Sequence, residues 1–260
     1  MIIAATIFKK SEAPLKLFIL RKLSKFGLNL LLEHKDFLLE TSSLVIDWWK
    51  GKKLAIVGPE GSGKDGLWNR LQGLEPQTTS SELNKIPTFK INFGLSNGKR
   101  FIITCKRSLN IGGEENHRDQ VNGWRAVCND SDIIFYMMSI DDLLTKNYEH
   151  ARIEKDLIWF HKNLAYLRKN THIHILINKI DTQINSHTDY AQIREQLSTE
   201  LKAFDAFVRK QLEPWDKNYT GSTLISVYNE NIYLKGIESA FNAVYQHMHK
   251  SEIPHQKKNF

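Results

Sequence analysis

Apolar positions recur along this chain with two different periods, and the change between them divides the sequence into two parts. In residues 9–40, leucine and phenylalanine are dense, and positions such as Leu15, Phe18 and Ile19 fall at roughly helical spacing among basic residues. This spacing predicts one or two amphipathic helices. From residue 51 onward, short apolar runs alternate with helical patterns, which is typical of an α/β sheet.

The apolar runs after residue 51 predict a mostly parallel, six-stranded sheet flanked by helices. The expected strands are 53–57, 87–93, 100–105, 132–138, 172–178 and 222–228. A turn at Ser96–Lys99 joins the second and third of them as a hairpin, which supplies the one antiparallel strand. Helices are expected at 146–169, 188–212 and 236–249, the second with an apolar stripe facing the core.

This pattern predicts three regions. Residues 1–50 form a helical extension, 51–249 form the α/β domain, and 250–260 form a basic tail. We expect the extension to pack on the domain. An interface with a partner or a second copy, and a membrane surface, stay open as alternatives, because basic amphipathic helices also lie in the plane of the membrane interface.

The composition fits a globular protein with an anionic ligand. With 260 residues, 41% of them hydrophobic and 25% charged, the chain can bury an ordinary core. A net charge of +7 and a pI of about 9.2 suit an anionic ligand, a nucleic acid or a membrane surface. The basic residues are dispersed without a long block, so specific binding of nucleic acid is not expected.

The remaining compositional signals favour the cytoplasm. The two cysteines, Cys105 and Cys128, are isolated, which fits a reducing compartment and small buried hydrophobic side chains rather than a zinc site. No apolar stretch approaches the ~20 residues of a membrane span. Ile2 stands where myristoylation needs glycine, and the chain ends at Phe260 without a prenylated cysteine. We therefore expect a cytoplasmic protein that meets a membrane only peripherally, through residues 1–50 or a partner.

A phosphate-binding loop occupies residues 58–65, which read G-P-E-G-S-G-K-D. The pattern G-x-x-x-x-G-K-[ST] is met at every required position except the last. An apolar run, 54–57, precedes it and a helical pattern follows, which is the context in which backbone N–H groups cradle phosphate oxygens. Lys64 is expected to reach the β- and γ-phosphates. Asp65 offers magnesium a carboxylate where the motif has a hydroxyl.

A second motif follows the apolar run 172–178, which leads directly into N-K-x-D. The carboxyl end of a parallel strand is where open α/β sheets bind ligands. There Asp181 can accept hydrogen bonds from N1–H and the exocyclic amine of guanine, and adenine lacks this pair of donors. We expect Asn178 to tie this loop to the phosphate loop and the stem of Lys179 to cover the face of the base.

With these motifs the chain resembles a small GTPase of the Ras superfamily, and its middle is most similar to the Arf-like branch. Residues 110–114, N-I-G-G-E, resemble the family's D-x-G-G-Q, and 86–88 resemble the I-P-T of switch I. Trp124 and Arg125 follow the glycines, as the same pair often does in that branch. Residues 226–228 resemble the loop of S-A-K type that touches the base.

The resemblance covers roughly residues 51–249 and implies a three-layer, Ras-like P-loop NTPase domain that binds GTP or GDP with Mg²⁺. It implies a phosphate site made of Gly58, Glu60, Gly61, Ser62, Gly63, Lys64 and Asp65. It implies a base site made of Asn178, Lys179, Asp181, Ser226 and Val227. Magnesium is expected at Asp65, Thr88 and Asn110, and the γ-phosphate at Thr88 and the N–H of Gly113.

Three departures from the family concern magnesium or water. Asp65 replaces a hydroxyl ligand, Asn110 replaces a carboxylate, and Glu114 replaces the glutamine that orients the attacking water. Asp65 can serve as a metal ligand and Glu114 as a general base. Without a firmly held cation, however, a carboxylate beside the phosphates repels the ligand by on the order of a few kcal/mol at an effective dielectric near 20.

The departures leave two hypotheses. One is a slow GTPase switch, in which the loops of Thr88 and Gly113 order around the γ-phosphate and relax after hydrolysis. The other is a pseudo-GTPase that acts as a structural or regulatory scaffold. In both, a protein partner is expected at the face that carries Thr88 and Gly112–Gly113, or at the N-terminal helices.

Other polar groups carry weaker signals. The spacing of His172 and His174 places both on one face of a strand. Asp141 and Asp142 are expected to cap the helix that follows them. His247 is expected to lie solvated in the basic C-terminal region.

Overall fold

The chain divides into two units, residues 1–50 and 51–260. The computed structural model describes part of the second unit: 52–76, 89–94, 100–105, 118, 123–129, 131–149, 152–164, 171–183 and 190–252. The predicted N-terminal helices lie outside these residues. None of the helices in the described part combines the length and the apolar character that crossing a bilayer requires.

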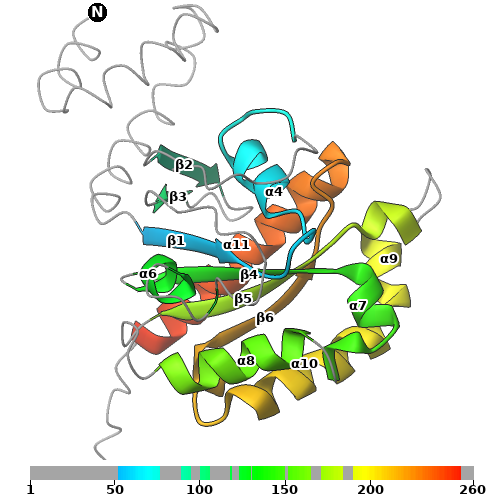
Figure 1. Cartoon of the computed structure of the whole chain (residues 1–260). Coiled ribbons are helices and arrows are strands. Elements are labelled where there is room, and N and C mark those ends of the chain that lie inside the picture. Colours follow the sequence, from blue (N-terminus) through cyan, green and yellow to red (C-terminus); the bar gives the residue numbers. More distant parts are fainter. Residues whose placement is uncertain are drawn as a thin grey trace, which may run out of the picture. The chain divides into compact units, whose positions relative to one another are not determined.

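The described part of the chain forms an α/β domain around a largely parallel sheet, as the sequence predicted (Figure 1). The strands are β1 (Lys52–Val57), β2 (Phe89–Gly94), β3 (Arg100–Cys105), β4 (Ile133–Ser139), β5 (His172–Asn178) and β6 (Tyr219–Leu224). Their order is β2-β3-β1-β4-β5-β6, in which β2 runs antiparallel to β3 and the other pairs are parallel. The carboxyl ends of β1, β4 and β5 therefore meet at one edge of the sheet.

Helices cover both faces of the sheet. They are α4 (Lys64–Leu71), α6 (Trp124–Cys128), α7 (Ile140–Leu144), α8 (Arg152–Asn163), α9 (Tyr190–Gln196), α10 (Ser198–Leu212) and α11 (Glu230–Glu252). Short 3₁₀ segments are η1 (Asn147–Glu149), η3 (Ile180–Gln183) and η4 (Asp216–Asn218). Helices α4 and α11 pack on one face, and α6, α8 and α10 pack on the other (Figure 1).

Strand β4 lies at the centre of the core. Ile133, Phe135 and Met137 join the cluster beneath α4 and α11, and Ile134 and Tyr136 join the cluster beneath α8 and α10. Because both faces are covered, the strand is a continuous apolar run without polar alternation, as buried parallel strands are.

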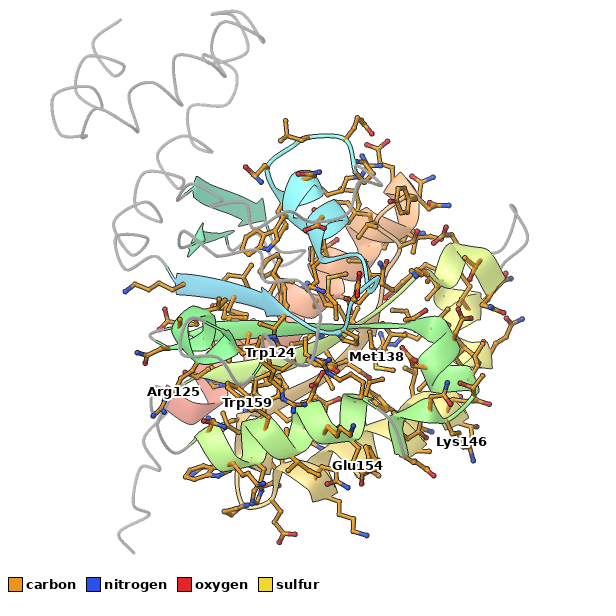
Figure 2. The ribbon with its side chains drawn as sticks, in the orientation of Figure 1. Trp124, Arg125, Met138, Lys146, Glu154 and Trp159 are labelled. Atoms are coloured by element: carbon orange, nitrogen blue, oxygen red, sulfur yellow. The ribbon has the colours of Figure 1, made fainter. Side chains whose placement is uncertain are left out.

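Aromatic rings hold α6 and α8 against β4. The ring centroids of Trp124 and Trp159 lie 5.5 Å apart in a T-shaped arrangement, and Trp124 also contacts Tyr136 and Phe160. Figure 2 shows Trp124 and Trp159 in the layer between α6 and α8. This packing holds the second half of α8 and the start of α6 against the middle of β4.

The predicted last strand, 222–228, is displaced from the observed one. Strand β6 ends at Leu224, and α11 begins at Glu230 instead of 236. Asn229 ends the intervening loop, because its Oδ1 accepts a hydrogen bond from the N–H of Ile232 at 3.2 Å, as a capping residue does. The start of β6 is polar and carries Gly221 at φ 114°, so the apolar pattern did not mark it.

Two predicted helices also differ from the observed ones. The helix expected at 188–212 is two helices, α9 and α10, separated at Leu197. Because apolar positions continue across the break, the periodicity alone did not show it. The helix expected at 146–169 is observed over Arg152–Asn163 and is preceded by η1, which follows Lys146 at φ 54°.

Candidate functional site

The phosphate-loop motif connects β1 to α4 at the carboxyl edge of the sheet. Gly58 and Gly63 have φ of 146° and 95°, a region that side chains disfavour. A Cβ at Gly58 would lie 2.1 Å from the carbonyl oxygen of Met137, and a Cβ at Gly63 would lie 2.2 Å from Nδ2 of Asn178. Gly61 also has a positive φ, 71°, but open space around it. Glycine is thus required by conformation at all three positions and by space at two.

Lys64 lies across its own loop. It is the first residue of α4, it is buried, and its Nζ donates to the carbonyl oxygen of Pro59 at 2.6 Å. Burial lowers the pKa of Lys64 to about 8, and the negative charge of Asp65 opposes this shift. The loop therefore holds a desolvated ammonium group at the start of a helix.

The loop also contains an unsatisfied hydroxyl. Ser62 is 2% exposed, and its Oγ has no hydrogen-bond partner among the residues that the structure describes. Buried hydroxyls are rarely left unpaired, so such an atom needs an explanation. Helix α4 begins at the same point, and Gly63 offers no side chain to cap it. The start of α4 thus combines uncapped N–H groups, an unpaired hydroxyl and a buried lysine, which are groups that anions bind at helix N-termini.

Asn178 joins the two motifs. This buried side chain, the last of β5, donates from Nδ2 to the carbonyl oxygen of Ser62 at 2.9 Å. Its Oδ1 accepts from the N–H of Val227 at 3.2 Å. The expected tie between Asn178 and the phosphate loop is present, and it extends to the loop after β6.

The base-reading candidates lie together just beyond Asn178. Oδ1 of Asp181 accepts a hydrogen bond from Oγ of Ser226 at 2.5 Å, and that Oγ accepts one from the N–H of Asn229 at 3.1 Å. Lys179 has φ 68°, which is uncommon for a residue with a side chain. Backbone in such regions is found where the surrounding structure enforces it, often at binding sites.

Arg70 also contacts the loop after β6, and sequence reasoning missed it. Its Nε donates to the carbonyl oxygen of Val227 at 3.0 Å, and its guanidinium lies 5.9 Å from the ring centroid of Tyr233. Helix α4 thus connects the phosphate loop to the loop after β6. A basic residue in the last turn of a helix is too common to have signalled this role.

A charged cluster under α8 was also missed. Asp156, fully buried, accepts from Nη1 of Arg118 at 3.0 Å, Nε of Arg152 at 2.7 Å and the hydroxyl of Tyr136 at 2.9 Å. Burial raises the pKa of Asp156, and Arg152 is the main opposing influence. Tyr136 pairs in the sheet with Val57, the residue before the phosphate loop. The spacing of Arg152 and Asp156 on one helix face was the available sequence signal.

Four of the expected site residues, Thr88, Asn110, Gly113 and Glu114, lie outside the described residues. Of the expected magnesium ligands, the described part of the chain includes Asp65. Across the residues that the structure describes, no group of three or more His, Cys, Asp or Glu side chains is placed to hold a metal ion.

The weaker candidates have structural roles in the described part. Ser139 caps α7, and Asp142 completes a capping box by accepting from the N–H of Ser139 at 3.2 Å, as expected of the acidic pair. His174 is buried between Thr220 and Thr223, and burial lowers its pKa to about 3. Cys128 is buried as expected, and burial raises the pKa of its thiol.

His247, which we expected to be solvated rather than functional, is partly exposed. Its Nε2 hydrogen-bonds to the carbonyl oxygen of Lys217 at 2.6 Å, and its ring centroid lies 5.3 Å from that of His172. The side chain thus contacts the start of β5 while one part of it stays exposed.

Comparison of the chain with protein-family models finds no match, and comparison with curated proteins finds none either. The function proposed below is therefore argued from the geometry of the site and from the motifs.

Proposed function

We propose that this chain binds guanine nucleotides on a Ras-like P-loop NTPase domain of Arf-like type. The observation that carries the proposal is the position of Asn178. Its amide contacts the phosphate loop at Ser62 and the base-side loop at Val227. Because one side chain bridges both segments, a single nucleotide can contact the two motifs at the same time.

At the phosphate end, the proposal explains three features of the loop. Phosphate oxygens would accept from the N–H groups at the start of α4 and from Oγ of Ser62, which has no partner within the described residues. Lys64 would exchange the carbonyl oxygen of Pro59 for the β- and γ-phosphates. Gly58, Gly61 and Gly63 keep the backbone in the shape that this cradle needs.

At the base end, Asp181 would distinguish guanine from adenine. One of its oxygens is held by Ser226, which orients the carboxylate and leaves its remaining acceptor capacity for N1–H and the exocyclic amine of guanine. Lys179, held at a positive φ directly before this turn, would place its stem over the base. Adenine offers no matching donors, so ATP is expected to be excluded.

Magnesium fits this site only through a changed set of ligands. Asp65 follows Lys64 in the first turn of α4 and supplies a hard oxygen, while Thr88 and Asn110 would complete the set. When bound, Mg²⁺ would neutralise part of the phosphate charge. We assign hydrolysis as slow, because Asn110 and Glu114 replace the groups that hold the metal's water and orient the attacking water.

The alternative is a pseudo-GTPase that holds nucleotide as a regulatory or structural element. The carboxylate of Asp65 favours it, since a negative charge directly after Lys64 repels phosphate wherever no cation screens it. In both versions the protein acts by binding a protein partner, through the face of Thr88 and Gly113 or through residues 1–50. We place the protein in the cytoplasm, with membrane contact at most peripheral.

Calorimetric titration of the purified chain with GTP in magnesium buffer tests the proposal, with ATP as the control. Binding of GTP without binding of ATP is the expected result, and single-turnover hydrolysis then separates the slow GTPase from the pseudo-GTPase. Equal binding of GTP and ATP would remove the role assigned to Asp181. Binding of neither would overturn the proposed function.

A further inference from the structure

The guanidinium of Arg152 has one nitrogen in a hydrogen bond and another without an acceptor. Its Nε donates to Oδ1 of Asp156 at 2.7 Å, and its carbon Cζ lies 5.9 Å from the ring centroid of Trp124. The side chain is 17% exposed, and its Nη2 is buried without an acceptor among the described residues. A buried donor on a charged group is costly to leave unpaired, so the arrangement favours an additional anion.

The charges of the residues around Asp156 also favour an additional anion at Arg152. Arg118 and Arg152 share the single carboxylate of Asp156, and the third partner, the hydroxyl of Tyr136, is neutral. Burial raises the pKa of Tyr136 well above its ordinary value, so it brings no negative charge. Around Asp156, two guanidinium groups therefore meet a single carboxylate, and Arg152 shares that carboxylate with Arg118.

Strand β4 connects the cluster to the strand that leads into the phosphate loop. Tyr136 is paired with Val57, which immediately precedes Gly58, and Arg152 is the first residue of α8, packed against Trp124. The charges of Arg152 and Asp156 both act on Lys64, whose pKa is lowered first by burial and further by Arg152. The guanidinium of Arg152 and the ammonium of Lys64 thus contribute to the same electrostatic environment.

We propose that Arg152 compensates the charge of the terminal phosphate of a bound guanosine triphosphate through its uncommitted guanidinium nitrogen. This inference rests on the proposed function and deepens it. Position 65 carries a carboxylate where the motif has a hydroxyl, so the site needs more positive charge than Lys64 alone provides. A guanidinium anchored by Asp156 supplies that charge in a fixed orientation.

Titration of the full chain with GTP and with GDP, in magnesium and in EDTA, tests the inference on Arg152→Gln. The expected result is a loss of about tenfold or more in GTP affinity, with GDP affinity changed less than about threefold, because GDP lacks the terminal phosphate. Arg152→Lys, which keeps the charge without the fork, should lower the preference for GTP by a smaller factor. It also provides the test if Arg152→Gln does not fold.

Arg209→Gln is the matched control. It removes the same charge from an exposed position on α10, where the guanidinium lies 5.1 Å from the ring centroid of Tyr219. It should leave the ratio of GTP to GDP affinity unchanged. Equal losses for GTP and GDP in the Arg152 variants, or no loss, would make Arg152 a purely structural partner of Asp156 and overturn the inference alone. Failure of the wild type to bind either nucleotide would overturn the proposed function as well.

Discussion

The side-chain amide of Asn178 donates a hydrogen bond to the carbonyl oxygen of Ser62, 2.9 Å away and 116 positions earlier in the chain. The same side chain accepts from Val227. The phosphate loop and the loop after β6 therefore depend on one buried residue, Asn178, for their position relative to each other and to the end of β5. A change at this residue should disturb phosphate and base contacts together.

Replacing Asn178 with alanine removes both hydrogen bonds and leaves buried backbone groups at Ser62 and Val227 unpaired. We expect a loss of about 1–3 kcal/mol in the free energy of unfolding and weaker binding of GTP and GDP alike. Urea unfolding and nucleotide titration measure the two effects. Asn163→Ala is the control, because that amide donates to the carbonyl oxygen of Trp159 within its own helix. Unchanged nucleotide affinity in Asn178→Ala would contradict the bridging role.

Asp181→Asn should change the base that is recognised. The carboxylate accepts from two donors of guanine, whereas an amide accepts at one atom and donates at the other. Xanthine carries a carbonyl where guanine carries its exocyclic amine, so the variant should lose GTP and gain xanthosine triphosphate. Asparagine can still accept from Ser226, so the loop should be kept. Competition between the two nucleotides provides the measurement, and retained preference for GTP would rule out Asp181 as the reader of the base.

Gly63→Ala should close the phosphate site. The added methyl group would lie 2.2 Å from Nδ2 of Asn178, at a backbone φ of 95°. Gly73→Ala is a matched control, because φ there is 76° and a Cβ meets nothing within 4 Å. Both variants pay the backbone strain of about 1–2 kcal/mol, but only Gly63→Ala should also lose nucleotide binding. Equal nucleotide affinity in the two variants would show that the contact with Asn178 is unimportant for the site.

Nucleotide binding should take up a proton between about pH 8 and 10. Burial lowers the pKa of Lys64 to about 8 in the free protein, and bound phosphate raises it by favouring the charged form. Above pH 8 the free protein therefore holds fewer protons than the complex, so affinity falls as pH rises. Calorimetry at pH 9 in two buffers of different ionisation enthalpy measures the uptake. The uptake should vanish in Lys64→Met, and its persistence there would assign it to another group.

Restoring the family residues at two positions should accelerate hydrolysis. Asp65→Ser returns the hydroxyl ligand, and Asn110→Asp returns the carboxylate beside the metal's water. We expect the double variant to exceed the wild type by tenfold or more in single-turnover hydrolysis of GTP, with the Glu60→Gln variant as a control for charge in the loop. If the rate does not rise although GTP binds, these two substitutions are not what limits turnover.

The sequence alone determined the parts of the site that depend on local spacing. The phosphate-loop pattern at 58–65 and the N-K-x-D at 178–181 each follow an apolar strand directly, so their position at a strand's carboxyl end could be read from the chain. The α/β class followed from the alternation of apolar runs and helical patterns. Strands β1 and β5 each contain an apolar run, Leu54–Val57 and Ile175–Ile177, and their bounds agree closely with the predicted ones.

Strand β6 was placed less well for a physical reason. It begins with a polar segment and a bulge near Gly221, and it is held by pairing with β5 instead of by its own pattern. The predicted strand, 222–228, therefore extended over residues 225–228, which lie in the loop after the strand. That loop is fixed by contacts from distant segments, namely Arg70, Asn178 and Asp181.

Tertiary structure alone decided which groups meet. Asp156 receives hydrogen bonds from Arg118, Tyr136 and Arg152. These four residues come from three segments of the chain, because Arg152 and Asp156 both belong to α8. Such buried charges are stabilised only by partners that folding brings together, and no local pattern encodes the distance between them. The sequence thus specified the two motifs by residue type and spacing. The bridge at Asn178 exists because the parallel sheet places the carboxyl ends of β1, β5 and β6 at one edge, and the cluster around Asp156 exists because α8 packs on β4.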